Sequence, residues 1–363
     1  MKAFRVLPIF LVAVLLCIEG CGGAGSPGAS AMVPGPPGPG PVGSTPTPVG
    51  STPTPVGSTP TPSPTTAPTN VAIYQGCGVF TAGDWYNKPI AGASVDPNSA
   101  NYVASVAAAD SGGFYLSTGV EFANLASGST PTHAVTATVP YHQNEFNANP
   151  PYPWMASYKI EPLSDKHAIV FTTPSNCHLF ESYGTNWSGS ALFAYSGWTW
   201  DLSKPFVSLP AGWPSSMASG LSLFTGAVKA EEIEAGAIKH ALNWGGTAHS
   251  VAQWGFVSPA SDTDGLAFSG GNANYQLPYG AHLRLKASFN DSGFGPQAKA
   301  ITTALKTYGM FLADTGSSNA LYGIEAQDGL NHWNSGDLAA LGNLHITDFE
   351  VLSLPSIQRV PGH

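Results

Sequence analysis

The chain has 363 residues, of which only 10% are charged, and its 22 acidic and 13 basic residues give a formal net charge of −9. Lys2, Arg5 and Glu19 are the only charged residues before position 71, so the rest of the chain carries 11 basic and 21 acidic side chains. A net negative domain without a basic stripe excludes nucleic acid as a partner and excludes electrostatic docking on anionic lipid, because both need clustered Lys and Arg.

The first 21 residues have the layout of a secretory signal peptide. Lys2 and Arg5 precede an apolar run over residues 6–16, and Ile-Glu-Gly-Cys follows at 18–21. This ending resembles a bacterial lipobox, in which a peptidase cuts before a cysteine that then carries lipid. We therefore predict lipidation at Cys21, which would hold the protein at the bacterial cell surface as its only membrane contact. Ordinary secretion, with cleavage near residue 23 or 24, is the alternative.

A low-complexity linker follows over residues 22–70. It contains no charged residue, is dominated by Pro, Gly, Ser and Thr, and repeats Pro-Val-Gly-Ser-Thr-Pro-Thr three times from Pro41. Such a composition cannot bury enough apolar surface to offset its chain entropy, so we predict a disordered spacer. Residues 71–363 are then a single β-rich globular domain.

Within that domain, short alternating or apolar segments separated by Gly, Asn, Ser and Pro predict strands. The clearest lie at 133–138, 168–172, 190–195, 237–244 and 282–289, and a closing strand is expected at 346–354. Ala300, Ala304 and Tyr308 recur at spacing four after Pro296, which predicts a helix over 296–311. A second, short helix is expected at 337–341. Many strands and few helices favour a β-sandwich of jelly-roll type with one or two peripheral helices.

Two cysteines remain in the domain, Cys77 and Cys177. In an exported protein an even pair is typical of a disulfide. Two buried free thiols are the alternative.

Carboxylates on predicted strands or beside them are the candidate catalytic groups. On a strand, Glu181 shares a face with Leu179 and Tyr183, so burial should raise its pKa and suit it to general acid catalysis. The alternative is a half-buried Glu paired with Arg284. Asp165, just before an apolar strand, is a candidate second carboxylate or a turn residue.

Another carboxylate candidate is Glu232, within the acidic run 231–234. It is interpreted either as a catalytic group facing His240 or as part of a solvated edge.

Cationic and aromatic side chains are the candidate substrate-binding groups. Arg284 and Lys286 share one face of the predicted strand 282–289, and with His240 they would position a substrate; a solvated outer face is the alternative. Trp198 and Trp200 also share a strand face and could stack on sugar rings, although core packing is the alternative.

No cofactor is expected from the motifs present. The histidines lack zinc-site spacing, and Gly-x-Ser-x-Gly is absent. Asp262-Thr263-Asp264-Gly265 is similar to the start of a calcium loop but lacks the later ligands, so a structural calcium ion is only an alternative.

The region 152–354 resembles a group of exported bacterial proteins that are defined by a shared sequence pattern. The matching pieces are Asp-Lys-His at 165–167, Leu-Phe-Glu-Ser-Tyr at 179–183, Gly-Ala-Ile-Lys-His-Ala-Leu at 236–242, Leu-Arg-Leu-Lys-Ala-Ser-Phe at 283–289, Ala-Leu-Lys-Thr-Tyr-Gly-Met at 304–310 and Ala-Asp-Thr-Gly at 313–316. Similar sequences carry Asp where this chain has Met217. The resemblance implies export and assigns no catalytic residue.

Together these observations favour a surface-tethered extracellular carbohydrate-active protein, a polysaccharide hydrolase that uses paired carboxylates. Its partner would be an extracellular polysaccharide or another surface ligand. A non-catalytic carbohydrate- or protein-binding module, and a structural or adhesive envelope lipoprotein, are the alternatives.

Overall fold

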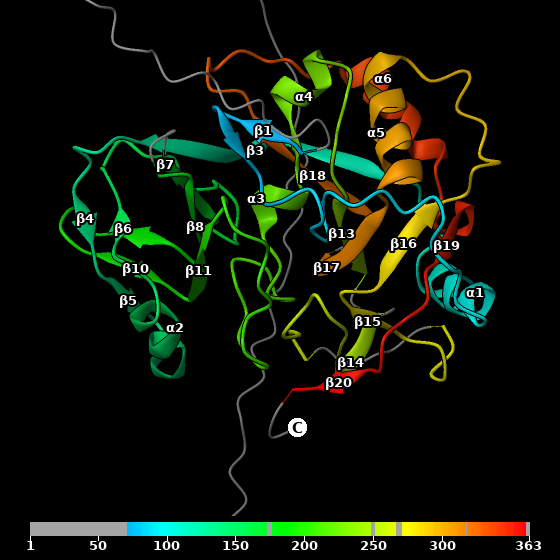
Figure 1. Ribbon diagram of the computed structural model, residues 1–363, viewed down its shortest axis with the longest axis horizontal. Helices are drawn as coiled ribbons and strands as arrows, with labels where there is room; N and C mark the ends of the chain where they lie inside the picture. The colour runs from blue at the N-terminus through cyan, green and yellow to red at the C-terminus, as the bar shows by residue number, and fades with distance from the viewer. Residues whose placement is uncertain (1–70, 173–175, 248–250, 266–270, 317, 361–363) are drawn as a thin grey trace, which may run out of the picture. The chain divides into compact units, whose positions relative to one another are not determined.

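A mixed β-sheet forms the framework of the fold (Figure 1). The computed structural model describes residues 71–360 except 173–175, 248–250, 266–270 and 317, and these residues belong to the unit Ser63–His363. Ten described strands make the sheet. Nine follow one another in the order β11 (Ser196–Asp201), β8 (His178–Tyr183), β7 (Ala168–Thr172), β3 (Tyr115–Ala126), β18 (Ala320–Glu325), β13 (Leu242–Thr247), β17 (Met310–Gly316), β16 (His282–Leu285) and β19 (Phe349–Val351), and β12 (Val228–Lys229) pairs with β18.

Strand β3 connects the two halves of this sheet. Its first part, from Tyr115 to Phe122, pairs in parallel with β18, and its last four residues, from Ala123 to Ala126, pair in parallel with β7. The strands β7, β8 and β11 therefore continue the sheet that β18, β13 and β17 begin.

Strand β7 is buried on both faces, which explains its uninterrupted apolar sequence. Ile169 and Phe171 pack into the larger hydrophobic core, whereas Ala168 and Val170 pack into a smaller one. The smaller core also contains Leu192 of the three-stranded sheet β5 (Val135–Ala137), β10 (Leu192–Ala194) and β9 (Asn186–Trp187). Two sheets thus pack against each other in this half of the fold.

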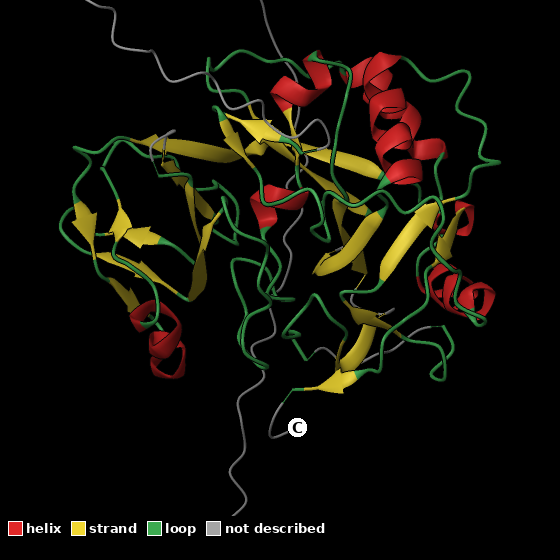
Figure 2. Cartoon of the chain, viewed as in Figure 1, coloured by secondary structure: helices red, strands yellow, loops and turns green. Residues whose placement is uncertain are grey.

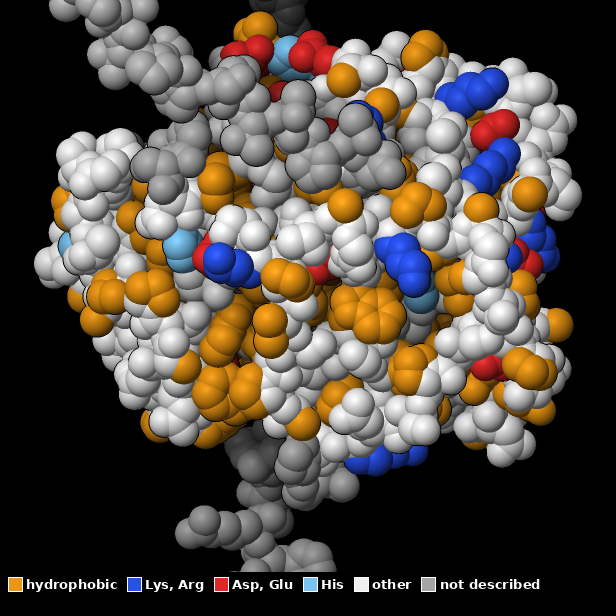
Figure 3. All heavy atoms as spheres, in the orientation of Figure 1, with side chains coloured by type: hydrophobic (Ala, Val, Ile, Leu, Met, Phe, Trp, Pro, Cys, Tyr) orange, Lys and Arg blue, Asp and Glu red, His pale blue; other side chains and the backbone are white. Residues whose placement is uncertain are grey.

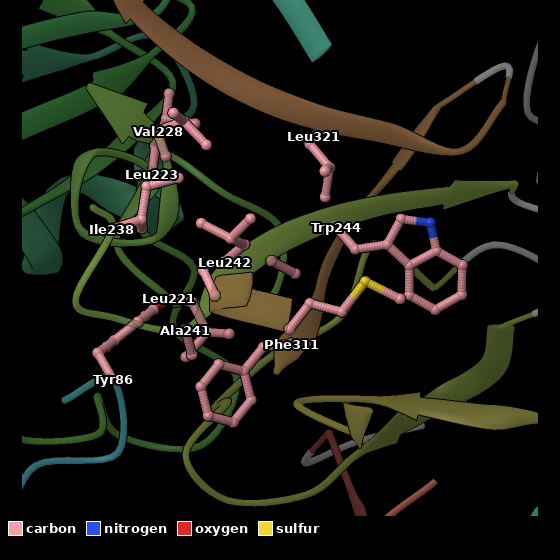
Figure 4. Close-up of a cluster of buried hydrophobic side chains, with 14 of the residues drawn as sticks. Tyr86, Leu221, Leu223, Val228, Ile238, Ala241, Leu242, Trp244, Phe311 and Leu321 are labelled. Carbon is pink, nitrogen blue, oxygen red and sulfur yellow. The ribbon is translucent and has the colours of Figure 1, made fainter. Parts of the chain in front are cut away.

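The larger core lies around β13 and its neighbours (Figure 4). Leu242 and Trp244 of β13, Phe311 of β17 and Leu321 of β18 are fully buried there, together with Tyr86. Burying side chains of this size contributes roughly 1.5–3 kcal/mol each before chain entropy is subtracted.

Most of the helices lie at the margins of the sheets, but one short helix, Leu223–Gly226, lies near the middle of the view (Figure 2). The helices are α1 (Ser99–Ala109), α2 (Gln143–Asn147), α3 (Leu223–Gly226), α4 (Ala230–Glu234), α5 (Pro296–Thr307) and α6 (Ser335–Leu338), with 3-10 turns η1 (Pro140–His142), η3 (Ala339–Asn343) and η4 (Ile346–Asp348). The remaining strands pair as β1 (Ile73–Tyr74) with β2 (Cys77–Gly78), β4 (Thr132–His133) with β6 (Tyr152–Pro153), and β14 (Val251–Phe256) with both β15 (Leu277–Tyr279) and β20 (Gln358–Arg359).

The predicted class, mainly β with few helices, is confirmed, and the packed sheets are consistent with a sandwich. Jelly-roll topology is not confirmed, because the pairs β3–β7, β3–β18 and β13–β17 are parallel, whereas a jelly roll is antiparallel. The predicted disulfide between Cys77 and Cys177 is confirmed.

Other predictions concern residues outside the described ones: the signal peptide, the linker and Cys21. Within the described part of the chain, no helix is both long and apolar enough to span a bilayer. The face of the molecule in Figure 3 carries few charged side chains, scattered among uncharged ones, in agreement with the low charged fraction of the sequence.

Candidate functional site

A pocket of about 1090 Å³ gathers side chains from both halves of the sheet. From one half come η1, α2, the segment just before β7 and the ends of β8 and β11; from the other come β14, the end of β17 and the loop after β14. Its titratable lining residues are Tyr141, His142, Glu145, Asp165, His167, Tyr183, Tyr195, Asp262, Asp264 and Asp314, and Trp213 and Trp254 also line it. The pocket thus combines five carboxyl groups with five large aromatic side chains.

Asp314 lies at the carboxyl end of β17, where the ladder with β13 is irregular. Trp244 pairs with Leu312 but the next residue, Gly245, pairs with Asp314, so Ala313 is an additional residue on β17. Bulges of this kind re-aim the side chains that follow them. Burial raises the pKa of Asp314 to about 7, and the Asp264 charge adds to this effect, although the Thr315 N–H donates to Oδ1 at 2.8 Å.

Asp262 belongs to a loop that is tied to the neighbouring loop 211–220 by backbone hydrogen bonds. The Ser261 N–H donates to the Ser219 carbonyl at 2.9 Å, and the Gly212 N–H donates to the Ser261 carbonyl at 2.8 Å. Burial raises the pKa of Asp262 to about 7, and the Glu145 and Asp264 charges add to this effect. The pocket therefore holds two half-buried aspartates that are partly protonated near neutral pH.

Glu145 of α2 forms the third buried carboxyl group of the lining. It is 2% exposed, and its Oε1 lies 2.5 Å from Nδ1 of His142, one helical turn earlier. Burial raises the pKa of Glu145, while the His142 contact opposes the rise. Its Oε2 has no hydrogen-bond partner among the described residues.

Asp165 lines the same pocket in an exposed turn, as the sequence suggested for a residue at the start of a strand. The turn at Gly184, where φ is +64°, fixes this segment, because the Gly184 N–H donates to the Asp165 carbonyl at 2.8 Å. Burial raises the pKa of Tyr183, and the charges of Asp165 and Asp314 raise it further. Both aspartates therefore act electrostatically on one phenol in the pocket.

His167 joins the pocket to a buried charged cluster. Its Nδ1 lies 3.0 Å from Oε1 of Glu121 and 3.0 Å from Oε2 of Glu161, and its Nε2 lies 3.1 Å from the Ser216 carbonyl. Burial alone would lower the pKa of His167, but the two carboxylates hold it well above its usual value. The imidazolium thus compensates buried negative charge.

The same three side chains have metal-binding geometry. Their ligand atoms lie within 4.8 Å of one another, and two carboxylates with an imidazole are a common donor set for divalent ions. An Nε2–H donated to the Ser216 carbonyl is the hydrogen bond that a metal-bound histidine usually makes. The cluster could hold a cation, and as an ion triad it is also satisfied by itself.

Glu181, the predicted general acid, lies beneath the pocket and is not part of its lining. It is fully buried, and burial raises its pKa to about 7. Four donors converge on it: the Ser216 and Ser222 hydroxyls at 2.9 and 3.1 Å, and the Leu223 and Phe224 N–H groups at 3.1 and 2.7 Å. The alternative pairing with Arg284 is wrong, because Arg284 binds Glu350.

Glu232 and His240 come together, but away from the pocket. Glu232 lies on helix α4 rather than on a solvated edge, and its Oε2 is 3.1 Å from Nε2 of His240. The buried Lys229 amino group lies 3.2 Å from the same nitrogen. Burial opposes ionisation of Glu232, but the charges of His240 and Lys229 hold its pKa at about 2.

The remaining predicted binding residues lie outside the pocket lining. Arg284 donates to Glu350 and to the Ile90, Ala91 and Ala93 carbonyls, and Lys286 donates to the Thr347 carbonyl at 2.7 Å. Trp200 is buried in the larger core. Trp198 is half-buried and packs edge-on against Trp213, which does line the pocket, with ring centroids 5.8 Å apart.

Sequence reasoning missed Glu145, Asp262 and Asp314 as site residues. Asp314 directly follows the buried apolar run 310–313, and a carboxylate at the end of such a strand was the available signal. Asp262 and Asp264 were noticed only as a possible calcium loop. Met217 also lines the pocket.

Comparison with protein families, with curated proteins and with solved structures finds no match for this chain. The disulfide between Cys77 and Cys177 indicates an oxidising, extracytoplasmic location.

Proposed function

We propose that the protein is an extracellular polysaccharide hydrolase whose active site is the acidic, aromatic-lined pocket. Asp314 is the general acid, and Asp165 is the carboxylate that acts as nucleophile or base. The observation that carries the proposal is the pairing of a half-buried Asp314, with its pKa raised to about 7, with an exposed Asp165 in one pocket.

Glycoside hydrolysis needs two carboxyl groups with different protonation states at the working pH. Burial keeps Asp314 partly protonated, so it can donate a proton to the leaving oxygen, whereas Asp165 lies in an exposed turn. Tyr183, Tyr195 and Trp213 supply rings against which sugars can stack. Asp262, with a pKa also near 7, is the alternative acid.

The test is hydrolysis of a polysaccharide panel, measured as newly formed reducing ends. Asp314→Asn and Asp165→Asn should each lower the rate by at least about 100-fold. Asp328→Asn, at an aspartate that pairs with His332 outside the pocket lining, should leave it unchanged. Because the acid must be protonated, the wild-type rate should fall as the pH rises through about 7.

Two results would count against this assignment. Full activity in Asp314→Asn with loss in Asp262→Asn would move the general acid to Asp262. Binding of a polysaccharide without product from any substrate would favour a non-catalytic binding module.

We also propose that Cys21 carries lipid and that residues 22–70 act as a spacer between the membrane and the domain. A Cys21→Ser variant expressed in a bacterial host should move from the membrane fraction to the medium or periplasm. Equal membrane association of both forms would contradict lipidation.

A further inference from the structure

The charge of the pocket restricts the substrates that it can take. Its lining includes five carboxyl groups and two histidines, and no Lys or Arg is among the lining residues described. Within the described part of the chain, Asp165, Asp262 and Asp314 form no ion pair with a cationic side chain. His142 and His167 offset part of this negative charge, since His142 acts on Asp262 and His167 on Asp314, but both histidines also pair with other carboxylates, so acidic groups outnumber basic ones in the lining.

The carboxyl groups also repel one another. The charges of Glu145 and Asp264 disfavour ionisation of Asp262, and the charge of Asp264 disfavours ionisation of Asp314. A ligand cation placed among them would relieve this repulsion, whereas a ligand carboxylate or sulfate would increase it. Polymers of uronic acids and sulfated sugars are thereby disfavoured.

A second observation is the wall of the pocket. Glu145 is only 2% exposed, and His142 and the Gly197 N–H both bind its carboxylate, so it adds negative charge from the wall without contacting a ligand itself. Tyr141, Tyr195 and the two lining tryptophans add aromatic faces, which attract cations as well as sugar rings.

We infer that the substrate is a polysaccharide of amino sugars with free, protonated amino groups. This inference rests on the proposed function only in taking the ligand to be a polysaccharide, and it concerns binding, which can be measured without catalysis.

The experiment compares two hexasaccharides with the same backbone, one of glucosamine and one of N-acetylglucosamine, at a pH near 7, where part of the free amines is charged and Asp262 is partly ionised. Titration calorimetry with the purified full-length protein should give an affinity at least about tenfold higher for the glucosamine hexamer, falling as salt is added. Asp262→Asn and Asp165→Asn should each weaken binding of the glucosamine hexamer several-fold without changing that of the acetylated one. Asp328→Asn should change neither.

The inference is overturned if the glucosamine hexamer does not bind, if it binds no more tightly than the acetylated hexamer, or if its affinity is independent of salt. These outcomes are distinct from failure of the proposed function. Cleavage of a neutral glucan without glucosamine binding would keep the hydrolase and reject the amino-sugar substrate. Salt-sensitive glucosamine binding without any cleavage would keep the amino-sugar ligand and reject the hydrolase.

Discussion

Glu181 and Asp314 show how two carboxyl groups with similar pKa values can have different roles. Burial raises both to about 7. Glu181 is enclosed by four hydrogen-bond donors at the start of α3, whereas Asp314 has one close donor, the Thr315 N–H, and faces the pocket. A group whose oxygens are all occupied holds structure together, and a group with free acceptor capacity can meet a substrate.

Replacing Glu181 should therefore reduce stability rather than catalysis. In Glu181→Gln the amide NH₂ would oppose two of the four donors, so we expect the free energy of unfolding in urea to fall by about 2–3 kcal/mol. The folded fraction should keep its activity. Glu234→Gln, at a half-exposed glutamate, is the matched control and should change neither quantity. Unchanged stability with lost activity would return Glu181 to the catalytic candidates.

The pKa of Glu232 predicts how acid affects stability. Its pKa in the fold, about 2, lies below the ordinary 4.5, so the ionised form stabilises the fold above pH 4.5. That stabilisation, about 3 kcal/mol, is lost as the pH falls from 4.5 toward 2. Urea unfolding at a series of pH values should show this loss in the wild type and a flatter curve in Glu232→Gln. An equally steep loss of unfolding free energy at low pH in the variant would mean that titratable groups other than Glu232 cause the acid dependence.

At the scale of the elements, the loop that carries Asp262 and Asp264 requires a glycine at position 265 to keep its conformation. Gly265 has φ +68°, and a Cβ there would lie 2.1 Å from ring atoms of Trp254, which lines the pocket. We expect Gly265→Ala to displace the indole and raise KM about five- to tenfold, with kcat nearly unchanged. Steady-state kinetics and tryptophan fluorescence would measure both effects.

The control for this prediction is Gly236→Ala. Gly236 has a similar φ of +66°, but a Cβ there would meet nothing within 4 Å, so this variant imposes backbone strain without the clash. Similar kinetics for the two variants would show that strain, not the position of Trp254, limits binding.

Some elements were predictable because their local signals agree. The apolar run 168–172 is β7 with the same bounds, and Pro296 starts α5 as expected. The predicted helix, 296–311, extends four residues beyond the observed end of α5 at Thr307. Gly309, with φ +75°, ends it, and Met310 begins β17. A glycine after the last helical turn was the signal that should have shortened the prediction.

Other elements could not be read from local patterns. Helix α1 consists mainly of Ala, Ser and other small residues without a charged face, and β3 mixes polar residues and Gly119 along its exposed part. The predicted strand 237–244 begins only at Leu242, and 282–289 ends at Leu285, because pairing with β17 and β19 sets these limits.

The site was only partly predictable for the same reason. Asp165 was found because it precedes a clear strand. The grouping of Glu145, Asp262 and Asp314 depends on contacts between loops distant in sequence and on the bulge at Ala313, neither of which has a local signature.

At the scale of the whole molecule, the disulfide closes a long loop. Cys77 and Cys177 are 100 residues apart, so cross-linking them restricts the unfolded chain and should stabilise the fold by about 4–5 kcal/mol. The double variant Cys77→Ser, Cys177→Ser should lose this amount in urea unfolding. Wild type treated with reductant should behave like the variant, and an unchanged urea midpoint in both would contradict the expectation.

Strand β3 has a consequence for motion. The walls of the pocket come from the two halves of the sheet, and β3 passes between those halves without interruption, changing partner from β18 to β7 between Phe122 and Ala123. A hinge needs a short segment that can absorb rotation. The ladder of β3 with β7 is regular, but the ladder with β18 is irregular between Ser117 and Glu121, where Gly119 has φ +83°, so β3 contains one such segment. The width of the pocket therefore depends on this one irregular stretch of β3, because it is the place in the connecting strand where the two halves could turn relative to each other.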